Sequence, residues 1–281
     1  MSILVFGKTG QVATELQRQS TDVIALGRDQ ADLMNPAACA ALIAQTDATA
    51  VINAAAYTAV DKAEEEEALA TVINGAAPSA MAEACAVRDL PFVYISTDYV
   101  FDGSSTTPWN VRDAVAPLGA YGRSKLAGEK GVRAAGGRFA ILRTSWVFSA
   151  HGNNFVKTML RLSESRDALT IVADQIGGPT AAGDIAAACL KIVEGLTAGQ
   201  SGGTYHFSGG PDVSWADFAR EIFAQANRNV TVSDIPSADY PTPAARPANS
   251  RMNCTDLQTD FDIKRPDWRA SLAAVLNDLK D

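Results

Sequence analysis

The chain begins with a short apolar run that is followed at once by two glycines and a helical stretch. Ile3 to Phe6 carries no polar residue, which is typical of a buried strand, and Gly7 and Gly10 come directly after it. Gln11 to Gln19 has the spacing of an amphipathic helix. A strand, a glycine turn and a helix in this order form the context in which an α/β sheet binds a dinucleotide. The spacing is GxxG with Ala13 as the third small position, so an ordinary strand-to-helix turn is the alternative.

The alternation of apolar runs and helical stretches continues to about residue 150. The runs lack the polar alternation of a sheet with one wet face, which favours parallel strands covered by helices on both sides. The sequence therefore predicts an α/β fold with a doubly wound parallel sheet of the Rossmann type. Strands are expected near residues 2–6, 22–26, 50–54, 91–96 and 138–143, and helices at 10–19, 36–45, 61–87 and 120–135.

After about residue 150 the pattern of apolar runs and helical stretches changes. This second half predicts a smaller C-terminal α/β domain that holds the substrate. Helices are expected at 153–164 and 215–226, and short strands at 169–172 and 204–208. We expect a dinucleotide-binding domain at 1–150, joined by about 176–200, and a substrate domain formed by 151–175 and 201–281. The proline-rich stretch from Ser237 to Pro247 cannot be a regular helix or strand, and loops of this length are often functional.

Charge and cysteine content exclude several classes of protein. The net charge is -8 and no basic run occurs, so the sequence predicts no nucleic-acid partner. The four cysteines are scattered, without the spacing of a zinc site or of a disulfide framework, which is typical of reduced thiols in the cytoplasm. No apolar stretch reaches the ~18 residues of a membrane span, and the early first strand argues against a signal peptide. We therefore expect a cytoplasmic protein with no membrane partner.

Tyr121 and Lys125 form a Tyr-x-x-x-Lys tetrad inside one of the expected helices. Residues four apart share a helix face, so the lysine ammonium is placed to stabilise a phenolate. That contact is expected to lower the pKa of the phenol from roughly 10 toward neutral pH, where the group can exchange a proton. The tetrad also occurs by chance on surface helices, so its weight depends on the residues that accompany it.

Small and polar residues follow the expected strands, at the edge where a doubly wound sheet binds its ligands. Thr97 ends the fourth strand, and its hydroxyl either binds a substrate oxygen beside Tyr121 or caps a turn. The alanines Ala54 to Ala56 follow the third strand and either leave room for a flat cofactor or fill the core. Arg28 follows the second strand, where it either pairs with the 2′-phosphate of NADP or is a solvated loop residue. The acidic stretch Asp61 to Glu67 suits the start of a helix and is most simply a solvated face.

These features, in this order along the chain, resemble the extended short-chain dehydrogenases/reductases. Longer motifs then resemble one family among them, the dTDP-4-dehydrorhamnose reductases, nearly from end to end. These motifs are Asp61-Lys-Ala-Glu64, Thr97-Asp98-Tyr-Val-Phe101-Asp-Gly103, Tyr121-Gly122 with Lys125-Leu-Ala-Gly-Glu129, Arg143-Thr-Ser-Trp146, Gly152-Asn-Asn-Phe155, Asp174-Gln175 with Pro179-Thr180, and Tyr240-Pro-Thr-Pro with Arg246-Pro247 and Asn249-Ser250-Arg251.

The resemblance implies an oxidoreductase that reduces the C4 ketone of a sugar nucleotide, dTDP-4-dehydro-L-rhamnose, with hydride from NADPH, or from NADH as the alternative donor. Tyr121 would be the proton donor, Lys125 its partner and the ribose anchor, and Thr97 the residue that tunes the pair. The positions that resemble the family's cofactor site are Gly7, Gly10, Gln11, Val12, Arg28, Asp32, Leu33, Ala54, Ala55 and Ala56, together with Tyr121 and Lys125. Those that resemble its substrate site are Thr97, Asp98, Trp146, Asn153, Asn154 and Arg246. Trp146 is alternatively a core aromatic, and Arg246 a brace for its own loop.

Magnesium is a point at which the chain departs from the family. Some members hold the metal at a dimer interface with acidic residues. Glu15 fits that pattern, but Gly183 stands where a glutamate is expected, beside Asp184. One carboxylate makes a poor site, because hard divalent cations need several oxygen ligands. We therefore predict no metal site, and a monomer or a weak homodimer.

Other functions stay open on the sequence alone. A sugar-nucleotide 4-epimerase shares the fold and the tetrad. A 4,6-dehydratase needs a carboxylate next to the aspartate that follows Thr97, and Tyr99 stands there. The alternative of another class is a non-catalytic regulatory subunit that binds nucleotide, and the intact Tyr121, Lys125 and Thr97 argue against it.

Overall fold

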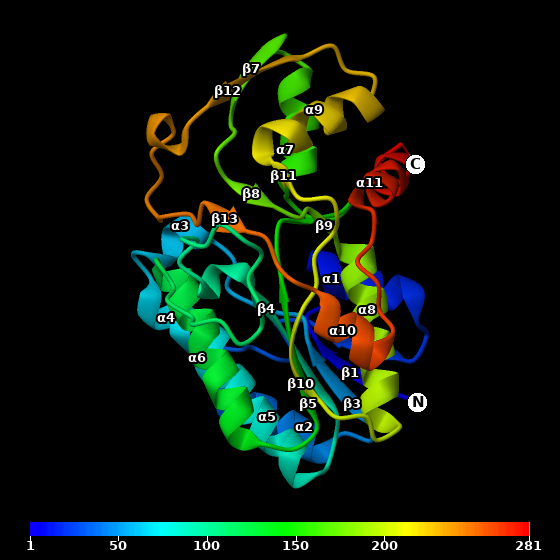
Figure 1. Ribbon diagram of the computed structural model, residues 1–281. Coiled ribbons are helices and arrows are strands. Elements are labelled where there is room, and N and C mark those ends of the chain that lie inside the picture. The colour runs from blue at the N-terminus through cyan, green and yellow to red at the C-terminus, as the bar shows by residue number, and fades with distance from the viewer. Residues whose placement is uncertain (281) are drawn as a thin grey trace.

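The chain folds around a central sheet of six parallel strands in the order β10–β5–β4–β3–β1–β2 (Figure 1). The structure is a computed structural model that describes residues 1–280. The strands are β1 (Ile3–Phe6), β2 (Val23–Leu26), β3 (Ala50–Asn53), β4 (Phe92–Thr97), β5 (Phe139–Thr144) and β10 (Gly203–His206). From β1 the sheet grows in both directions, as a doubly wound sheet does, so the predicted fold class is confirmed.

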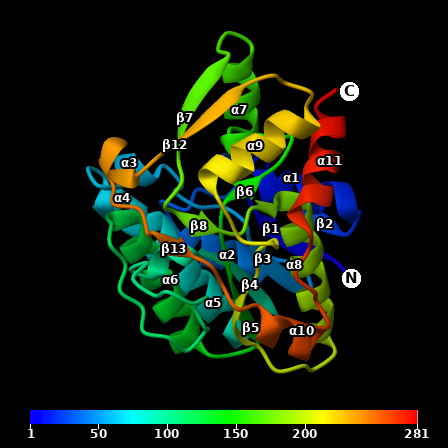
Figure 2. The ribbon, with the colours of Figure 1, turned by 45° about the horizontal axis from the view of Figure 1, so that its top comes forward.

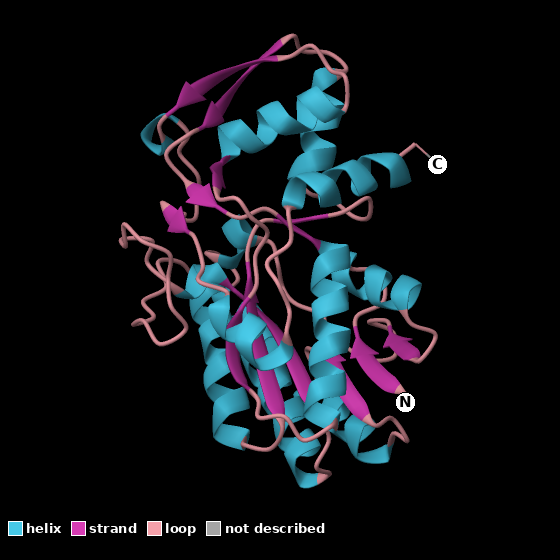
Figure 3. Cartoon of the chain, turned by 45° about the vertical axis from the view of Figure 1, so that its right-hand side comes forward, coloured by secondary structure: helices cyan, strands magenta, loops and turns pink. Residues whose placement is uncertain are grey.

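Both faces of the central sheet are covered by helices, which explains why its strands show no polar alternation (Figure 3). Successive side chains of a strand point to opposite faces. Ile3 and Val5 of β1 belong to the core on one face, and Leu4 and Phe6 to the core on the other. The first face is covered by α1 (Gln11–Gln19) and α8 (Ala182–Thr197), and the second by α2 (Pro36–Gln45), α5 (Ala77–Val87) and α6 (Ala120–Ala135).

The stretch expected to be one helix from 61 to 87 is broken into separate segments, so that prediction is wrong. The segments are α3 (Val60–Ala63), α4 (Glu67–Thr71), the π-helical turn Val72–Ala76 and α5. Glu66, the N-cap of α4, stands at the break and contacts residues that precede it in the chain. Glu66 accepts a hydrogen bond from the Tyr57 hydroxyl at 2.7 Å and pairs with Lys62 at 2.8 Å.

A smaller lobe stands beyond the carboxyl ends of the central strands (Figures 1 and 2). Its core includes Phe218, Trp268 and Leu272, packed between three helices and a parallel pair of strands. The elements of this lobe are α7 (Phe155–Ser163), α9 (Trp215–Gln225), α11 (Trp268–Asp278), β7 (Ala168–Val172) and β12 (Thr231–Ile235). The helices expected at 153–164 and 215–226 are present, whereas β12 and α11 were not predicted. The proline-rich segment is irregular apart from the single 3-10 turn Ser237–Asp239.

Short strands connect the two lobes. They are β8 (Ile176–Gly177), which pairs with β11 (Val213–Ser214) and β13 (Asn249–Ser250), and β6 (Val147–Phe148), which pairs with β9 (Thr180–Ala181). Two elements of the range 201–281 belong to the central-sheet side, since β10 lies in that sheet and α10 (Thr255–Phe261) packs into its core. The rest of the expected domain division stays a prediction. Within residues 1–280, no helix combines the length and the apolar character needed to cross a membrane.

Helix α6 lies unusually close to its neighbours, because glycines face them. A Cβ atom added at Gly128 would overlap the Asn74 carbonyl oxygen and the Tyr94 side chain. The Tyr94 hydroxyl donates a hydrogen bond to that same carbonyl at 2.7 Å. Gly128 is therefore required by close contact rather than by backbone conformation.

We predict that Gly128→Ala lowers the free energy of unfolding by about 1–3 kcal/mol, because the added methyl group overpacks a filled core. Urea denaturation measures the change. Gly183→Ala is the matched control, since the nearest atoms to a Cβ there are 3.6 Å away and α8 should gain slightly from losing a glycine. Equal unfolding free energies for Gly128→Ala and the parent chain would show that α6 can move away without cost.

Candidate active site

Buried polar groups without a partner gather at the carboxyl ends of three neighbouring central strands. Asn53 Nδ2 ends β3, Asp98 Oδ2 follows β4, and Thr144 Oγ1 ends β5. Among the described residues, only Gln225 in the smaller lobe has another buried side-chain atom without a hydrogen bond. Such atoms are rare in folded proteins, and each calls for an explanation such as a ligand or an ordered water. They lie at the edge where doubly wound sheets bind ligands.

Lys125 is buried next to this edge. It is 2% exposed, its Nζ donates a hydrogen bond to the Ile95 carbonyl at 2.7 Å, and the same atom lies 4.2 Å from the ring centroid of Tyr94. Burial lowers the pKa of Lys125 to about 7, while the Glu129 carboxylate acts in the opposite direction. The ammonium form is therefore lost as the pH rises through neutrality.

Tyr121 lies in the first turn of α6 and packs edge-on against Tyr99, with ring centroids 5.7 Å apart. The sequence predicts a lowered phenol pKa, and this prediction is wrong for the structure. Burial raises the pKa of Tyr121 to about 12, and the nearby Thr97 hydroxyl offsets only part of that rise. The Lys125 ammonium has no such effect, because it is directed at the Ile95 carbonyl.

Thr97 and Asp98 join the end of β4 to the smaller lobe. The Thr97 hydroxyl donates to Asp98 Oδ1 at 3.1 Å and accepts from the Tyr99 backbone N–H at 3.2 Å, so it also caps the next turn. Burial raises the pKa of Asp98 to about 6, and the nearby hydroxyls of Ser250 and Thr97 offset part of that rise. The structure thus brings Thr97, Asp98 and Tyr121 together, as their order along the chain suggested.

The glycine turn after β1 has the shape of a cradle for a dinucleotide. Gly7 has φ +117°, and a Cβ there would lie 3.3 Å from the backbone of Ala54 and Ala55. Gly10 is the N-cap of α1 and supplies no side-chain cap, which leaves the first N–H groups of the helix to an anion. These features fit the pyrophosphate of a dinucleotide. The glycine turn after β1 and the backbone after β3 therefore form one continuous surface.

Other residues expected at the cofactor lie around this cradle. Arg28 has a side chain that is 75% exposed, 3.4 Å from an oxygen of Asp32, and Leu33 is buried beneath them. Gln11 does not point freely into the site. Its Oε1 accepts hydrogen bonds from the Ser149 hydroxyl at 2.9 Å and from Asn154 Nδ2 at 3.0 Å. Val12 is in the core between α1 and the sheet.

Several of the residues expected at the substrate are engaged by other side chains in this structure. Trp146 has a left-handed backbone, with φ +50°, and its ring stacks on Trp215 at 3.6 Å between centroids. Asn154 is the N-cap of α7 and accepts from the Lys157 N–H, whereas Asn153 is exposed. These contacts leave Asn153 as the freer of the two asparagines.

Arg246 forms a two-point ion pair with Asp61 of α3, at 2.9 and 2.8 Å. It also donates to the Ala244 carbonyl at 2.7 Å, so it braces its own loop. A narrow pocket beside Tyr121 is closed by this loop. Its lining includes Tyr99, Gly122, Ala244, Ala245 and Pro247. The proline-rich segment therefore reaches the tyrosine, although Arg246 itself is held by a carboxylate.

Some residues that hold the site in place were missed from the sequence. Asn74 in the π-helical turn donates to the Ser124 hydroxyl at 2.9 Å and to the Tyr57 carbonyl at 3.0 Å, which ties α6 to the segment after β3. Glu64 accepts the Ala120 N–H at 2.8 Å and so caps the start of α6. The signal for Asn74 was a lone amide in an apolar stretch. Glu64 had its charge and its place in the Asp61-Lys-Ala-Glu64 motif, neither of which indicates its partner.

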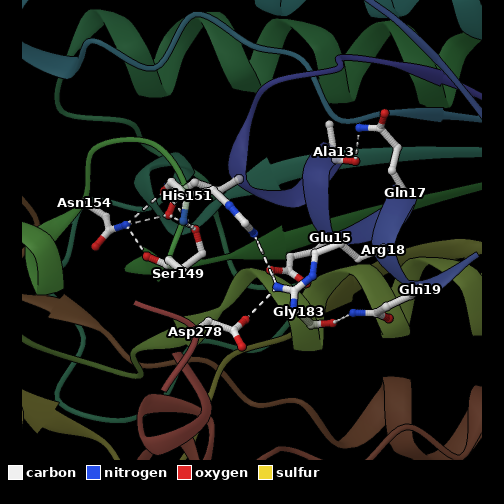
Figure 4. Close-up of polar contacts among 12 residues, drawn as sticks. Ala13, Glu15, Gln17, Arg18, Gln19, Ser149, His151, Asn154, Gly183 and Asp278 are labelled. Atoms are coloured by element: carbon white, nitrogen blue, oxygen red, sulfur yellow. Dashed lines mark hydrogen bonds and ion pairs between the residues drawn. The ribbon is translucent and has the colours of Figure 1, made fainter. Parts of the chain in front are cut away.

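The acidic residue singled out for magnesium, Glu15, is already occupied (Figure 4). Its Oε1 lies 3.1 Å from the Arg18 guanidinium and 3.1 Å from His151 Nε2. Asp184 does not join it, because its carboxylate accepts a hydrogen bond from the Ser271 hydroxyl at 2.6 Å. Within residues 1–280, no group of three His, Cys, Asp or Glu side chains is placed to hold a metal.

Comparison with known proteins agrees with this geometry over the whole chain. The family model described as "RmlD substrate binding domain" matches residues 1–281. A dTDP-4-dehydrorhamnose reductase of Sinorhizobium fredii (strain NBRC 101917 / NGR234) is 43% identical, over 96% of this chain and 95% of the relative.

Solved structures show the same relationship. A dTDP-4-dehydrorhamnose reductase from Clostridium acetobutylicum ATCC 824 superposes with a TM-score of 0.94 at 37% identity, covering 100% of both chains. One from Bacillus anthracis str. Ames, solved in complex with NADP, gives a TM-score of 0.93 at 34% identity, covering 99% of this chain and 100% of the other.

Fold and site together define the class of protein, an oxidoreductase with a doubly wound sheet and a dinucleotide cradle at its ligand-binding edge. The tetrad, the strand-end hydroxyl and the glycine cradle all lie at one sheet edge. The chain belongs to the dTDP-4-dehydrorhamnose reductase family.

We expect EDTA to leave the hydrodynamic size and the melting temperature of the protein unchanged. The reason is that the Glu15 carboxylate already pairs with Arg18 and contacts His151, at the position where it would otherwise bind a hard cation. Light scattering and thermal unfolding, with added magnesium chloride as the control, measure the effect. A shift from dimer to monomer on chelation would contradict it.

Proposed function

We propose that the chain reduces the C4 ketone of dTDP-4-dehydro-L-rhamnose to dTDP-L-rhamnose, with NADPH as hydride donor and Tyr121 as proton donor. The observation that carries the proposal is the packing of Tyr121 against the turn after β4, which Thr97 caps, with Lys125 one helical turn away. The names of the relatives support the substrate, and the NADP complex of one of them supports the cofactor. NADH is the alternative donor.

In this proposal the glycine cradle and the start of α1 hold the pyrophosphate, and Arg28 holds the 2′-phosphate. Ala54 to Ala56 leave flat backbone beside it, and Lys125 anchors the ribose. The bound nicotinamide supplies the hydride. The exposed guanidinium of Arg28 shares its charge with Asp32, so the 2′-phosphate has to compete for it.

The chain's own groups then handle the proton. A Tyr121 pKa of about 12 keeps the phenol protonated at neutral pH, ready to protonate an alkoxide that forms beside it. The Lys125 ammonium, held at the Ile95 carbonyl, acts on the ribose and so stabilises the bound cofactor. Because the pKa of Lys125 is about 7, that stabilisation is present at acidic pH and is lost as the pH rises through neutrality. Turnover should therefore decline on the alkaline side.

On the substrate side we propose that Trp146 packs against the hexose, that Thr97 and Asp98 bind its hydroxyls, and that Arg246 meets the diphosphate with Asn153 and Asn154 nearby. The free Oδ2 of Asp98 supports its part, since it lacks a partner in the described chain. For Arg246 to bind the diphosphate, its ion pair with Asp61 has to break. The domain division stated from the sequence is retained here as a proposal, with β10 and α10 moved to the first domain.

Consumption of NADPH with the ketosugar tests the function directly. A 4-epimerase would instead interconvert sugar nucleotides with no net consumption of cofactor, and a regulatory subunit would bind nucleotide without turnover. Tyr99, at the place where a 4,6-dehydratase needs a carboxylate, argues against that reaction. Absence of NADPH consumption by the purified chain would reject the proposal.

We predict that Tyr121→Phe keeps the fold and cofactor affinity but lowers kcat by about 10²–10⁴-fold, the usual contribution of general acid catalysis. Tyr99→Phe is the matched control, because that ring packs against Tyr121 but has no proposed proton role. Stopped-flow measurement of NADPH oxidation gives both values. A near-parental kcat in Tyr121→Phe would remove the tyrosine from the mechanism.

We predict that Arg246→Ala raises KM for the sugar nucleotide, whereas Asp61→Asn does not raise it. Losing the guanidinium should raise KM by roughly 10-fold or more, since a charge-assisted contact contributes about 1.5–3 kcal/mol. Asp61→Asn should leave KM unchanged or lower it, because it frees Arg246 for the diphosphate. If Arg246 only braces its loop, both variants raise KM together.

A further inference from the structure

A buried carboxylate on α6 joins the helix to the ends of two central strands. Glu129 is fully buried. Its Oε1 accepts hydrogen bonds from the Ser96 hydroxyl at 2.6 Å and from Arg143 Nε at 2.8 Å, and its Oε2 accepts from Arg143 Nη2 at 2.7 Å. Arg143 is itself only 2% exposed. The buried carboxylate thus accepts three short hydrogen bonds, two of them from a guanidinium and one from a hydroxyl.

Each of these partners immediately precedes, in the chain, a strand-end residue of the candidate site. Ser96 precedes Thr97 at the end of β4, and Arg143 precedes Thr144 at the end of β5. Glu129 also lies four residues after Lys125, on the same face of α6. One side chain therefore touches both strands and the helix that carries Tyr121 and Lys125.

We propose that Glu129 is a positioning residue for the site, whose carboxylate, held by Arg143 and Ser96, fixes α6 against the ends of β4 and β5 and holds Lys125 in its charged form. The proposal rests on the proposed function in taking Lys125 to act as an ammonium. It concerns a residue that makes no contact with substrate.

The charges around this carboxylate favour that assignment. Glu129 opposes the effect of burial on the pKa of Lys125, and it also acts on the neighbouring phenol of Tyr94. On the far side, His206 Nε2 of β10 lies 3.4 Å from Arg143 Nη1. Burial and that guanidinium lower the pKa of His206 to about 3, so the imidazole is neutral at working pH. Two further groups face this cluster. Tyr121 raises the pKa of Tyr94, and Asp113 raises the pKa of His206.

Arg133, one turn further along α6, reaches the same carboxylate from solvent. Its guanidinium lies 3.2 Å from Glu129 Oε2, and its side chain is 37% exposed. Arg133 and Arg143 both line a cleft of about 630 Å³ on the β10 side of the sheet. A substitution of Arg133 therefore changes the electrostatic surroundings of Glu129 without altering a residue of the site itself.

The test is the titration of Lys125 itself, followed by NMR of lysine labelled with ¹³C at Cε in the full chain. The Lys125 resonance is the one that Lys125→Arg removes. Glu129→Gln should lower the pKa of Lys125 by on the order of one unit, because an opposing charge is lost. Arg133→Gln should raise it, because Glu129 then loses a competing cation. Lys130→Gln, which removes the same charge from an exposed position on the same helix, should leave it unchanged.

A purely structural role would not shift this pKa in opposite directions. If Glu129→Gln fails to fold because Arg143 is left unpaired, Arg133→Gln alone decides, and an unchanged Lys125 pKa in that folded variant overturns the proposal. An equal shift in Lys130→Gln also overturns it. The titration needs no turnover, so its outcome is separate from that of the NADPH assay. Where the chain turns over, the alkaline limb of kcat should move with the measured pKa.

Discussion

The close approach of α6 to strand β4 is the constraint on which the site depends. A Cβ at Gly122 would overlap the Tyr99 carbonyl oxygen, and one at Gly128 the Asn74 carbonyl oxygen, so the helix reaches its place only with hydrogen at both positions. At that separation the Lys125 ammonium meets the Ile95 carbonyl at 2.7 Å. A side chain between helix and strand would move the lysine away from the strand ends, where the other polar groups lie.

This proximity places charges where water is excluded, at a cost in stability. A buried ion pair such as Glu129 with Arg143 contributes little net stability, because desolvation offsets the attraction. Its effect is geometric, since several fixed contacts leave the strand ends a single arrangement. The raised pKa of Asp98 and the lowered pKa of Lys125 have the same origin in burial. The site is therefore organised before any ligand arrives.

The sequence predicts β1, β3, β4 and β5 well because each is a mostly buried apolar run, and it predicts the family because long motifs recur in order. Local patterns fail where the partner is distant in the chain. Asp61 and Glu64 read as a solvated face, yet Asp61 binds Arg246 and Glu64 caps α6 at Ala120. The spacing of Tyr121 and Lys125 gives their shared helix face but not their burial, and burial decides the pKa of each.

Asp98 follows a central strand and is buried near Ser250 of β13, one of the short strands between the two lobes. Burial holds its pKa near 6, above the ordinary value of 3.8, so the folded state keeps a proton that the unfolded chain releases. Protonation therefore stabilises the folded state as the pH falls from about 6 toward 4, and above that range the buried carboxylate costs stability. A ligand hydroxyl donating to the free Oδ2 would favour the charged form and remove that cost. We therefore expect a ligand that binds Asp98 to stabilise the folded state most at pH values above 6.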